Sequence, residues 1–263
     1  MTSTHSYVLD NAAVEAPARL DALAAMYDPG TRRRLTALGV RAGWHCLEIG
    51  GGNGSVASWL ADSVGASGRV VVTDIDTRHL EALSRPNLEV RRHDVVADAL
   101  PQRAFDLVHV RLVLVHLAEW QHVLRKLIDA LTPGGWLVAE EFDSDSLQPD
   151  PVESPGEVVL RAHVGLARVM RDNGFDRRCG RRLYARFREL GLMNVGAEAR
   201  LEMLRAGTPG AALLRANYEQ LRRAIVDGGD VSEAEMSADM VRLEDPAFMM
   251  PSSIMWTVWG QGS

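Results

Sequence analysis

The stretch Leu47–Ser55 constrains the fold of this chain more than any other. Cys46–Ile49 is typical of the end of a short buried strand, and Ser55–Leu60 is typical of the start of a helix. Residues 50–54 between them include four glycines, whereas an ordinary tight turn needs only one or two. A glycine-rich turn from strand to helix lets the backbone approach a ligand closely and directs free N–H groups at it. The stretch therefore predicts a site for a nucleotide-type ligand.

Strand and helix patterns alternate through the first half of the chain, with five strands in about 140 residues. The run Arg69–Thr73 is almost continuously apolar and β-branched, which is typical of a strand covered on both faces of a parallel sheet. We therefore predict an α/β fold with a doubly wound, mostly parallel, seven-stranded sheet. The other predicted strands are Leu88–Arg92, Phe105–Val110, Trp136–Glu141, a strand around Val195–Leu204, and Ile254–Trp259 as a closing edge strand.

Apolar residues at helical spacing divide the rest of the chain into helices. The clearest stripe runs from Trp120 to Leu131. The predicted organisation is an N-terminal helical arm (1–40), a ligand-binding half (41–143), and a remainder (144–263) whose helical insertions, at about 144–180 and 208–245, form a lid. The predicted helices are 11–27, 31–38, Thr77–Leu83, Trp120–Leu131, Gly156–Arg171, Arg181–Leu190, 209–226 and 232–243.

Two aspartates follow the second predicted strand, about twenty residues beyond the glycine turn. An acidic residue at this position holds a pair of ribose hydroxyls in nucleotide-binding sheets. Asp74 directly follows the apolar run, where the carboxyl end of the strand meets the ligand. Asp76 is better placed to cap the predicted helix Thr77–Leu83. We therefore predict that Asp74 holds the ribose.

The amino-acid composition restricts which partners the protein binds and in which cellular compartment it is expected. The formal net charge of −6 and the isoelectric point near 5.8 argue against non-specific binding to nucleic acids or anionic membranes. Two cysteines, Cys46 and Cys179, make no disulfide framework and favour a cytoplasmic protein. Residues 1–5 show no basic segment followed by an apolar run, and no apolar stretch reaches membrane-spanning length. Lys126 is the only lysine, a bias that favours a GC-rich bacterial genome.

The spacing of the glycines separates two kinds of nucleotide site. The dinucleotide fingerprint G-x-G-x-x-G requires glycine or alanine at position 55, where this chain has Ser55. The stretch Glu48–Gly54 instead places an acidic residue before glycines at alternate positions, and it resembles motif I of the class I S-adenosylmethionine (SAM) dependent methyltransferases. Asp94-Val95, after the third strand, and Pro133–Gly135, before the fifth, are similar to further motifs of that family.

This resemblance covers residues 42–142 and implies a Rossmann-like fold with SAM as the cofactor. It implies that Glu48 lies near the methionine end of the cofactor and that Asp94 accepts a hydrogen bond from the adenine amino group. The guanidinium of Arg111 would suit the cofactor carboxylate. The expected cofactor-binding residues are Glu48, Gly50, Gly51, Gly52, Gly54, Asp74, Ile75, Asp94, Val95 and Arg111.

The segment Arg111–Leu117 resembles the part of the family that lines the methionine and substrate side. His116 in this segment is either a general base titrating near pH 6–7 or a structural residue, and the sequence leaves the two readings about equal. The expected substrate pocket contains Tyr7 from the arm, His116, and His163 from the first insertion. No metal is expected.

The resemblance implies in-line displacement, in which a heteroatom or carbanion of the substrate attacks the methyl group of the cofactor. The expected acceptor is a small organic molecule, a bacterial secondary metabolite; the methylated element and the oligomeric state stay open. One alternative is a protein with this fold that does not methylate and serves as a cyclase or a binding protein. Another is a nicotinamide-dependent oxidoreductase, which the chain supports less, because Lys126 has no tyrosine four positions before it.

Overall fold

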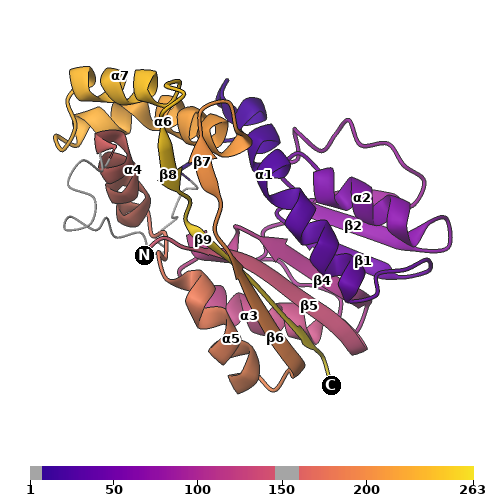
Figure 1. Cartoon of the computed structure of the whole chain (residues 1–263). Helices are drawn as coiled ribbons and strands as arrows, with labels where there is room; N and C mark the ends of the chain where they lie inside the picture. The colour runs from indigo at the N-terminus through magenta and orange to yellow at the C-terminus, as the bar shows by residue number, and fades with distance from the viewer. Residues whose placement is uncertain (1–7, 146–159) are drawn as a thin grey trace.

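A computed structural model of the chain describes residues 8–145 and 160–263 (Figure 1). Its centre is a seven-stranded sheet with strand order β3-β2-β1-β4-β5-β9-β6, in which β9 runs in the opposite direction to the other six strands. The predicted doubly wound, mostly parallel sheet is confirmed. Its strands are β1 (His45–Ile49), β2 (Arg69–Asp74), β3 (Leu88–Arg92), β4 (Phe105–Arg111), β5 (Leu131–Asp143), β6 (Met193–Arg200) and β9 (Ile254–Gln261).

Helices cover both faces of this sheet (Figure 1). Helices α1 and α2 pack on one face, and α3 and α5 pack on the other. The remaining helices gather beyond the carboxyl ends of the parallel strands, beside a two-stranded sheet of β7 and β8 (Figure 1). The elements outside the main sheet are α1 (Ala16–Ala37), α2 (Ser55–Val64), the short 3₁₀ helix η1 (Leu114–His116), α3 (Trp120–Asp129), α4 (Arg161–Asp172), α5 (Cys179–Glu189), β7 (Met203–Arg205), α6 (Pro209–Asp227), α7 (Glu233–Arg242) and β8 (Met249–Pro251).

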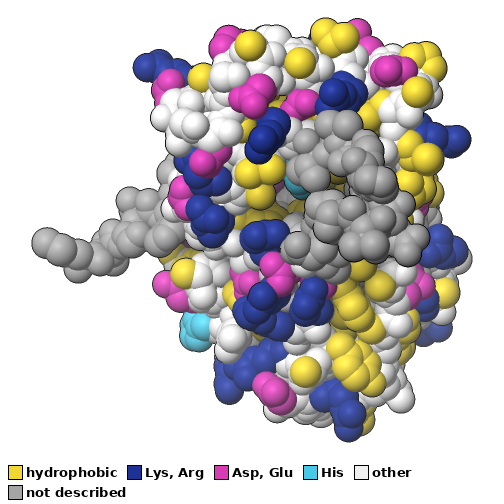
Figure 2. All heavy atoms as spheres, turned by 60° about the vertical axis from the view of Figure 1, so that its left-hand side comes forward, with side chains coloured by type: hydrophobic (Ala, Val, Ile, Leu, Met, Phe, Trp, Pro, Cys, Tyr) yellow, Lys and Arg dark blue, Asp and Glu magenta, His cyan; other side chains and the backbone are white. Residues whose placement is uncertain are grey.

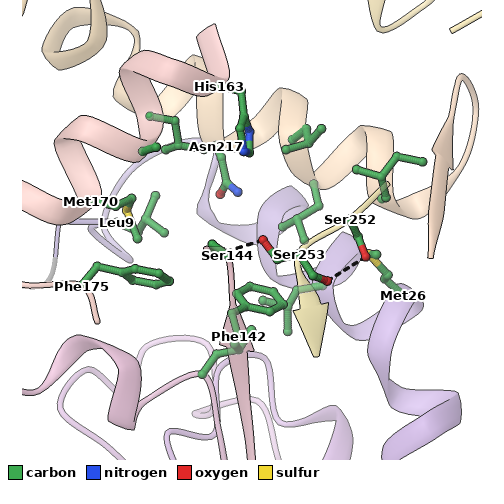
Figure 3. Close-up of a pocket in the computed structure, with 18 of the residues that line it drawn as sticks. Leu9, Met26, Phe142, Ser144, His163, Met170, Phe175, Asn217, Ser252 and Ser253 are labelled. Atoms are coloured by element: carbon green, nitrogen blue, oxygen red, sulfur yellow. Dashed lines mark hydrogen bonds between the residues drawn. The ribbon is translucent and has the colours of Figure 1, made fainter. Parts of the chain in front are cut away.

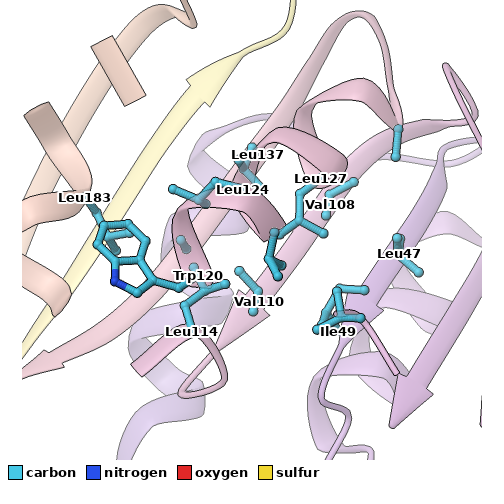
Figure 4. Packing of buried hydrophobic residues seen from close by; sticks show 14 of the residues in the cluster. Leu47, Ile49, Val108, Val110, Leu114, Trp120, Leu124, Leu127, Leu137 and Leu183 are labelled. Atoms are coloured by element: carbon cyan, nitrogen blue, oxygen red, sulfur yellow. The ribbon is translucent and has the colours of Figure 1, made fainter. Parts of the chain in front are cut away.

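The strands are apolar on both faces because each face packs against helices. Leu47 and Ile49 of β1 face α3 and α5, whereas Cys46 faces α1 and α2. The stripe of α3 packs into the first of these layers, where Trp120 and Leu124 lie against the strands (Figure 4). Burying one such side chain stabilises the fold by about 1.5–3 kcal/mol.

A second apolar core holds α4, α6 and α7 together, separate from the two layers of the sheet. Tyr218 and Ile225 of α6 are fully buried in it. Leu9, which precedes α1, and Leu204 of β7 also belong to this core. The chain therefore assembles a helical subassembly at the edge of the sheet where ligands bind in such folds.

The N-terminal region forms one continuous helix, so the prediction of two helices separated by Asp28–Gly30 is wrong. Proline interrupts a helix because it lacks an N–H donor. Here Pro29 is tolerated because tertiary contacts hold the helix on both sides of it: Asp28 and Thr31 are buried and bonded to the sheet. The guanidinium of Arg200 lies against Gly30, in the space that a Cβ at that position would occupy.

Three other predicted elements differ from the structure. Residues Thr77–Leu83 form successive turns, closed by bonds from the Leu80 and Leu83 amides, and not a helix. The predicted strand Val195–Leu204 is divided, because its last residues turn away to form β7. The last strand is not at an edge, since β9 bonds to both β5 and β6 and leaves β6 at the edge. Part of the predicted helix Gly156–Arg171 lies outside the described residues.

Within residues 8–145 and 160–263, no helix combines the length and the apolarity that crossing a bilayer would need. On the face shown in Figure 2, basic and acidic side chains are interspersed. Along α5, for example, Arg181 pairs with Asp143 at 2.5 Å and Arg182 pairs with Asp176 at 2.8 Å. Such mixing, with a net charge of −6, gives no support to a nucleic-acid surface.

Candidate cofactor site and adjoining pocket

The glycine-rich turn joins β1 to α2 at the carboxyl edge of the sheet. Gly50, Gly52 and Gly54 have φ values of +72°, +56° and +76°, which other residues rarely adopt. A Cβ at Gly50 would lie 2.2 Å from a methyl group of Val113. At Gly52 the nearest atom would be a methyl group of Leu20 on α1, at 3.3 Å. Gly50 is therefore required for packing, whereas Gly52 is covered only by an aliphatic side chain of the N-terminal helix.

Asp74 lies beside this turn at the end of β2. Its carboxylate accepts hydrogen bonds from the Gly52 amide at 3.2 Å and from the Asp76 amide at 3.1 Å. Burial raises the pKa of Asp74, and these amide donors oppose the shift. Asp76 pairs with Arg78 on the surface, and its carboxylate also accepts a bond from the Arg78 amide. Asp74 is thus the carboxylate held against the glycine backbone.

The ends of β2 and β3 bring the other predicted cofactor residues to the same edge. Asp74 pairs in register with Arg92, and Asp94 lies two residues beyond it. The Asp94 carboxylate is exposed and accepts the Val96 amide at 2.8 Å. Ile75 is 51% exposed, and Val95 is buried. The turn, two carboxylates and an exposed aliphatic side chain are therefore contributed by three neighbouring strands.

Helix α1 and the segment before it lie across this edge. Asp21 of α1 accepts a hydrogen bond from the Asn53 side chain at 2.9 Å. The Asn11 carbonyl bonds to Nε2 of His79 at 2.9 Å, on the far side of the turn. Together with the contact between Leu20 and Gly52, these bonds make the N-terminal arm a cover over the turn.

A buried histidine lies between two carboxylates on the face of the sheet covered by α1. Nδ1 of His109 is 2.7 Å from Glu48, and its Nε2 is 3.2 Å from Glu140. Burial opposes protonation of His109, but the two carboxylates outweigh it and raise the pKa to about 9. Burial would likewise raise the pKa of Glu140, but bonding to His109 and the charges of His109 and Arg111 lower it to about 2. The Glu48 carboxylate is therefore committed to this network.

Glu140 joins four elements through one carboxylate. It accepts hydrogen bonds from Thr257 of β9 at 2.6 Å and from Arg200 of β6 at 2.9 Å. It also accepts a bond from Thr31 of α1 and contacts His109 of β4. The network therefore fastens the N-terminal helix to the sheet.

Arg111 of β4 also fastens α1 to the sheet. Its guanidinium donates to Asp28 at 2.9 Å and to Thr31 at 3.0 Å, both on α1, and the Arg111–Asp28 pair is almost completely buried. The structure thus pairs the Arg111 side chain with two residues of α1. A contact between Arg111 and the cofactor carboxylate stays a prediction.

The loop after β4 is held by a second buried carboxylate. Glu141 accepts hydrogen bonds from the amides of Val113, Leu114 and Val115 at 2.8–3.3 Å. Burial raises the pKa of Glu141 to about 8, while these amide donors oppose the shift. Leu112 has a φ of +54°, a strained conformation for a residue with a side chain. The loop that carries His116 is therefore fixed from the sheet.

A pocket with a volume of about 150 Å³ lies between this loop, α1, and the helices α4 and α6 (Figure 3). Both predicted pocket histidines within the described residues line it: His116 from η1 and His163 from α4. Tyr7 lies outside the described residues. The polar lining also includes Arg19, Ser144, Arg177, Asn217, Ser252 and Ser253, which sequence reasoning did not identify. The apolar lining residues include Leu9, Leu23, Met26, Leu112, Phe142, Leu166, Met170, Phe175, Leu213 and Met250.

The two histidines are neutral at pH 7. Burial, with a smaller contribution from the charge of Arg19, lowers the pKa of His116 to about 4. Its ring packs edge-on against Phe175, with ring centroids 5.2 Å apart. Burial also lowers the pKa of His163, whose Nδ1 is 3.3 Å from the Tyr218 hydroxyl.

The residues at the glycine turn fit the cofactor that the sequence resemblance implies. An adenosine needs an acceptor for its ribose hydroxyls, backbone free of side chains, and apolar contact for the ring. Asp74, Gly52 and the exposed side chain of Ile75 supply these three at one edge. Asp94 adds an exposed acceptor beside them.

Replacing Asp74 by alanine should weaken SAM binding by about 10- to 100-fold, because hydrogen bonds to a charged group contribute about 1.5–3 kcal/mol. Calorimetric titration measures this loss, and thermal unfolding shows whether the variant folds. Asp76→Ala is the matched control, since it removes a neighbouring carboxylate that pairs with Arg78. Unchanged affinity in a folded Asp74→Ala protein would reject the assignment.

Comparison with known sequences places this chain in one family. Residues 20–199 match the family described as a methyltransferase domain. The methyltransferase str2 of Strobilurus tenacellus is 31% identical over 169 residues, which cover 63% of this chain and 59% of that protein. The matches span only about half to three fifths of the length of the first curated relatives, between 47% and 59%.

Solved structures are similar in fold. The YcgJ protein of Bacillus subtilis aligns over 90% of this chain and 99% of its own, with a TM-score of 0.60 and 12% identity. Phosphoethanolamine N-methyltransferase 2 of Haemonchus contortus, in complex with phosphomonomethylethanolamine and S-adenosylhomocysteine, aligns over 90% of this chain and 52% of that one. Its TM-score is 0.56 at 13% identity. At such identities the likeness concerns the fold.

Proposed function

Since the chain belongs to the family described as a methyltransferase domain, we propose that it is a SAM-dependent methyltransferase and that it methylates a small organic molecule held in the apolar pocket. The observation that carries the proposal is the position of this pocket next to the glycine turn. Leu23 of α1 lines the pocket, while Leu20 of the same helix covers Gly52. Leu112 lines the pocket, while its neighbour Val113 packs against Gly50.

The chain contributes to methyl transfer mainly by holding two reactants together. Bound SAM supplies an electrophilic methyl group on a positively charged sulfur. Asp74 and the glycine turn hold the nucleoside part, and the mostly apolar pocket holds the acceptor and excludes water. Such positioning can supply much of the acceleration. The helices α4 and α6, with α7 packed behind them, form the lid of this pocket, and α1 closes the side toward the cofactor.

The pocket favours a small molecule over a macromolecule. Its walls come from α1, α4, α6, β8 and the ends of β4 and β5, so that the acceptor is enclosed from several sides. Aliphatic and aromatic side chains with a few polar groups are typical of sites for small organic ligands. We propose a cytoplasmic enzyme that acts on a bacterial secondary metabolite, and binds neither nucleic acids nor membranes.

A turnover assay tests the proposal. The protein is incubated with methyl-labelled SAM and, separately, with small-molecule extracts, a bulk protein fraction and RNA. We expect label only in small molecules, each with a mass increase of one methyl group. Transfer to the protein or RNA fraction, or SAM binding with no methylated product in any fraction, would contradict the proposal.

His116 provides a test of proton transfer in the pocket. As a general base, its loss in His116→Ala should lower kcat by about 10²–10⁴-fold with little change in SAM affinity. Because the pKa of His116 is lowered to about 4, the wild-type rate should fall as the pH drops through about 4, and not through 6–7 as expected from the sequence. The pH–rate profiles of both proteins measure this.

His122→Ala is the matched control, since His122 is exposed on α3. An alternative role for His116 is packing against Phe175. A His116→Ala protein with a lower melting temperature and turnover within a few fold of wild type would exclude the base and favour packing.

A further inference from the structure

The charged side chains that line the pocket are basic, whereas a cationic substrate is favoured by acidic ones. The described residues that line it include two arginines, Arg19 and Arg177, and no aspartate or glutamate. Arg19 is buried and donates to Gln220 at 3.0 Å and to Asn11 at 2.7 Å. Desolvating an ammonium group without a paired carboxylate is costly, and the like charge of two guanidinium groups disfavours it further. The lining therefore disfavours an amine that is protonated at neutral pH.

Among the described residues of the lining, two buried polar atoms have no hydrogen-bond partner: Nε of Arg177, a donor, and the amide oxygen of Asn217, an acceptor. In Figure 3, Asn217 points from α6 into the cavity below His163, across from Phe142 and Phe175. A buried acceptor is normally satisfied by protein, water or ligand. The serine hydroxyls that line the pocket already have partners within the protein. The Ser144 and Ser253 hydroxyls bond to each other at 3.0 Å, and the Ser252 hydroxyl donates to the Ser253 carbonyl at 2.8 Å.

From these two observations we infer that the pocket selects an uncharged, mostly apolar molecule of about one ring, and that Asn217 recognises a hydroxyl group on it. The volume of about 150 Å³ is similar to that of an apolar cavity that accepts benzene. A hydroxyl donor satisfies the amide oxygen of Asn217, whereas a neutral amide cannot neutralise an ammonium ion. The inference rests on the proposed function, because it takes this pocket to be the acceptor site.

Three probes of nearly equal shape test the inference by direct binding. Benzyl alcohol carries a hydroxyl, benzylamine is an ammonium ion at pH 7, and toluene carries neither. Ligand-observed NMR titration should show benzyl alcohol binding about 3- to 10-fold more tightly than toluene, as expected for one neutral hydrogen bond. Benzylamine should bind more weakly than toluene.

Two variants connect the preference to Asn217. Asn217→Leu should bind toluene at least as well as the wild type and should lose the preference for benzyl alcohol. Asn217→Asp places a carboxylate in the pocket and should reverse the order, with benzylamine binding best. Retained toluene binding shows that Asn217→Leu keeps a folded pocket.

The outcomes separate this inference from the proposed function. Equal binding of all three probes, tighter binding of benzylamine, no binding of any probe, or a hydroxyl preference that survives in Asn217→Leu would each overturn the inference. None of these measurements requires turnover. If the predicted preference holds but no small molecule is methylated, the proposed function fails while the assignment of Asn217 as the polar group of the pocket is retained.

Discussion

Replacing Gly52 by valine should reduce SAM binding by at least about 100-fold, the largest effect that we expect on cofactor affinity. Gly52 has a φ of +56°, where a β-branched residue is strained by about 1–3 kcal/mol. Its Cβ would also extend toward Leu20, into the space between α1 and the turn. That is the space a ligand needs in order to lie against the backbone beside Asp74. Calorimetric titration with SAM measures the loss.

Gly65→Val is the matched control for backbone strain. Gly65 has a φ of +62° at the opposite end of α2, and a Cβ there would meet no atom within 4 Å. Both variants should therefore lose stability through backbone strain, which thermal unfolding measures, but only Gly52→Val should lose SAM binding. Normal binding by Gly52→Val would show that the turn is not the cofactor site.

Replacing Glu140 by alanine should lower the free energy of unfolding by about 3–5 kcal/mol, the largest effect that we expect on stability. The substitution leaves His109 and Arg200 without the buried carboxylate that both contact. It also removes the acceptor for hydroxyls of α1 and β9. At about 2–4 °C per kcal/mol for a domain of this size, the melting temperature should fall by about 6–20 °C.

Glu89→Ala is the control for losing a carboxylate that pairs with arginine. Glu89 is on the edge strand β3 and pairs with Arg69 and Arg91, which are exposed. Exposed pairs contribute about 0–1 kcal/mol, so this variant should melt within a few degrees of the wild type. A Glu140→Ala protein as stable as Glu89→Ala would mean that the buried network does not fasten α1 to the sheet.

The same network predicts how stability depends on pH. The folded pKa of His109, about 9, exceeds its ordinary value of 6.5. Its contribution is therefore fully present below about pH 6.5 and is lost as the pH rises through about 9. Denaturant unfolding between pH 6 and 9.5 should show this loss in the wild type. The loss should be smaller in Glu140→Ala, because one of the two carboxylates that raise the pKa is absent.

Local sequence was sufficient to predict the strands of the sheet and the candidate site residues at the strand ends. The glycine turn and Asp74 were recognised from apolar runs that end in glycine or aspartate, and Asp94 from its position after an alternating strand and from the resemblance. The structure places all three at the ends of neighbouring strands. His109 was missed, although a histidine inside an apolar strand was a usable signal. Nothing in the helical stripe of residues 209–226 distinguished Asn217 from the polar residues around it.

The sequence by itself determined the α/β fold and a glycine-rich turn for a nucleotide-type ligand, because these follow from periodicity and turn chemistry over a few residues. The resemblance of that turn to a known motif indicated the family. Only the tertiary structure decided that α1 continues through Pro29, that β9 lies inside the sheet, and that Glu48 turns to His109, 61 residues away. It also brought His116, His163 and Asn217 to one pocket. These features depend on contacts between distant segments, which exist only when the helices and strands pack together.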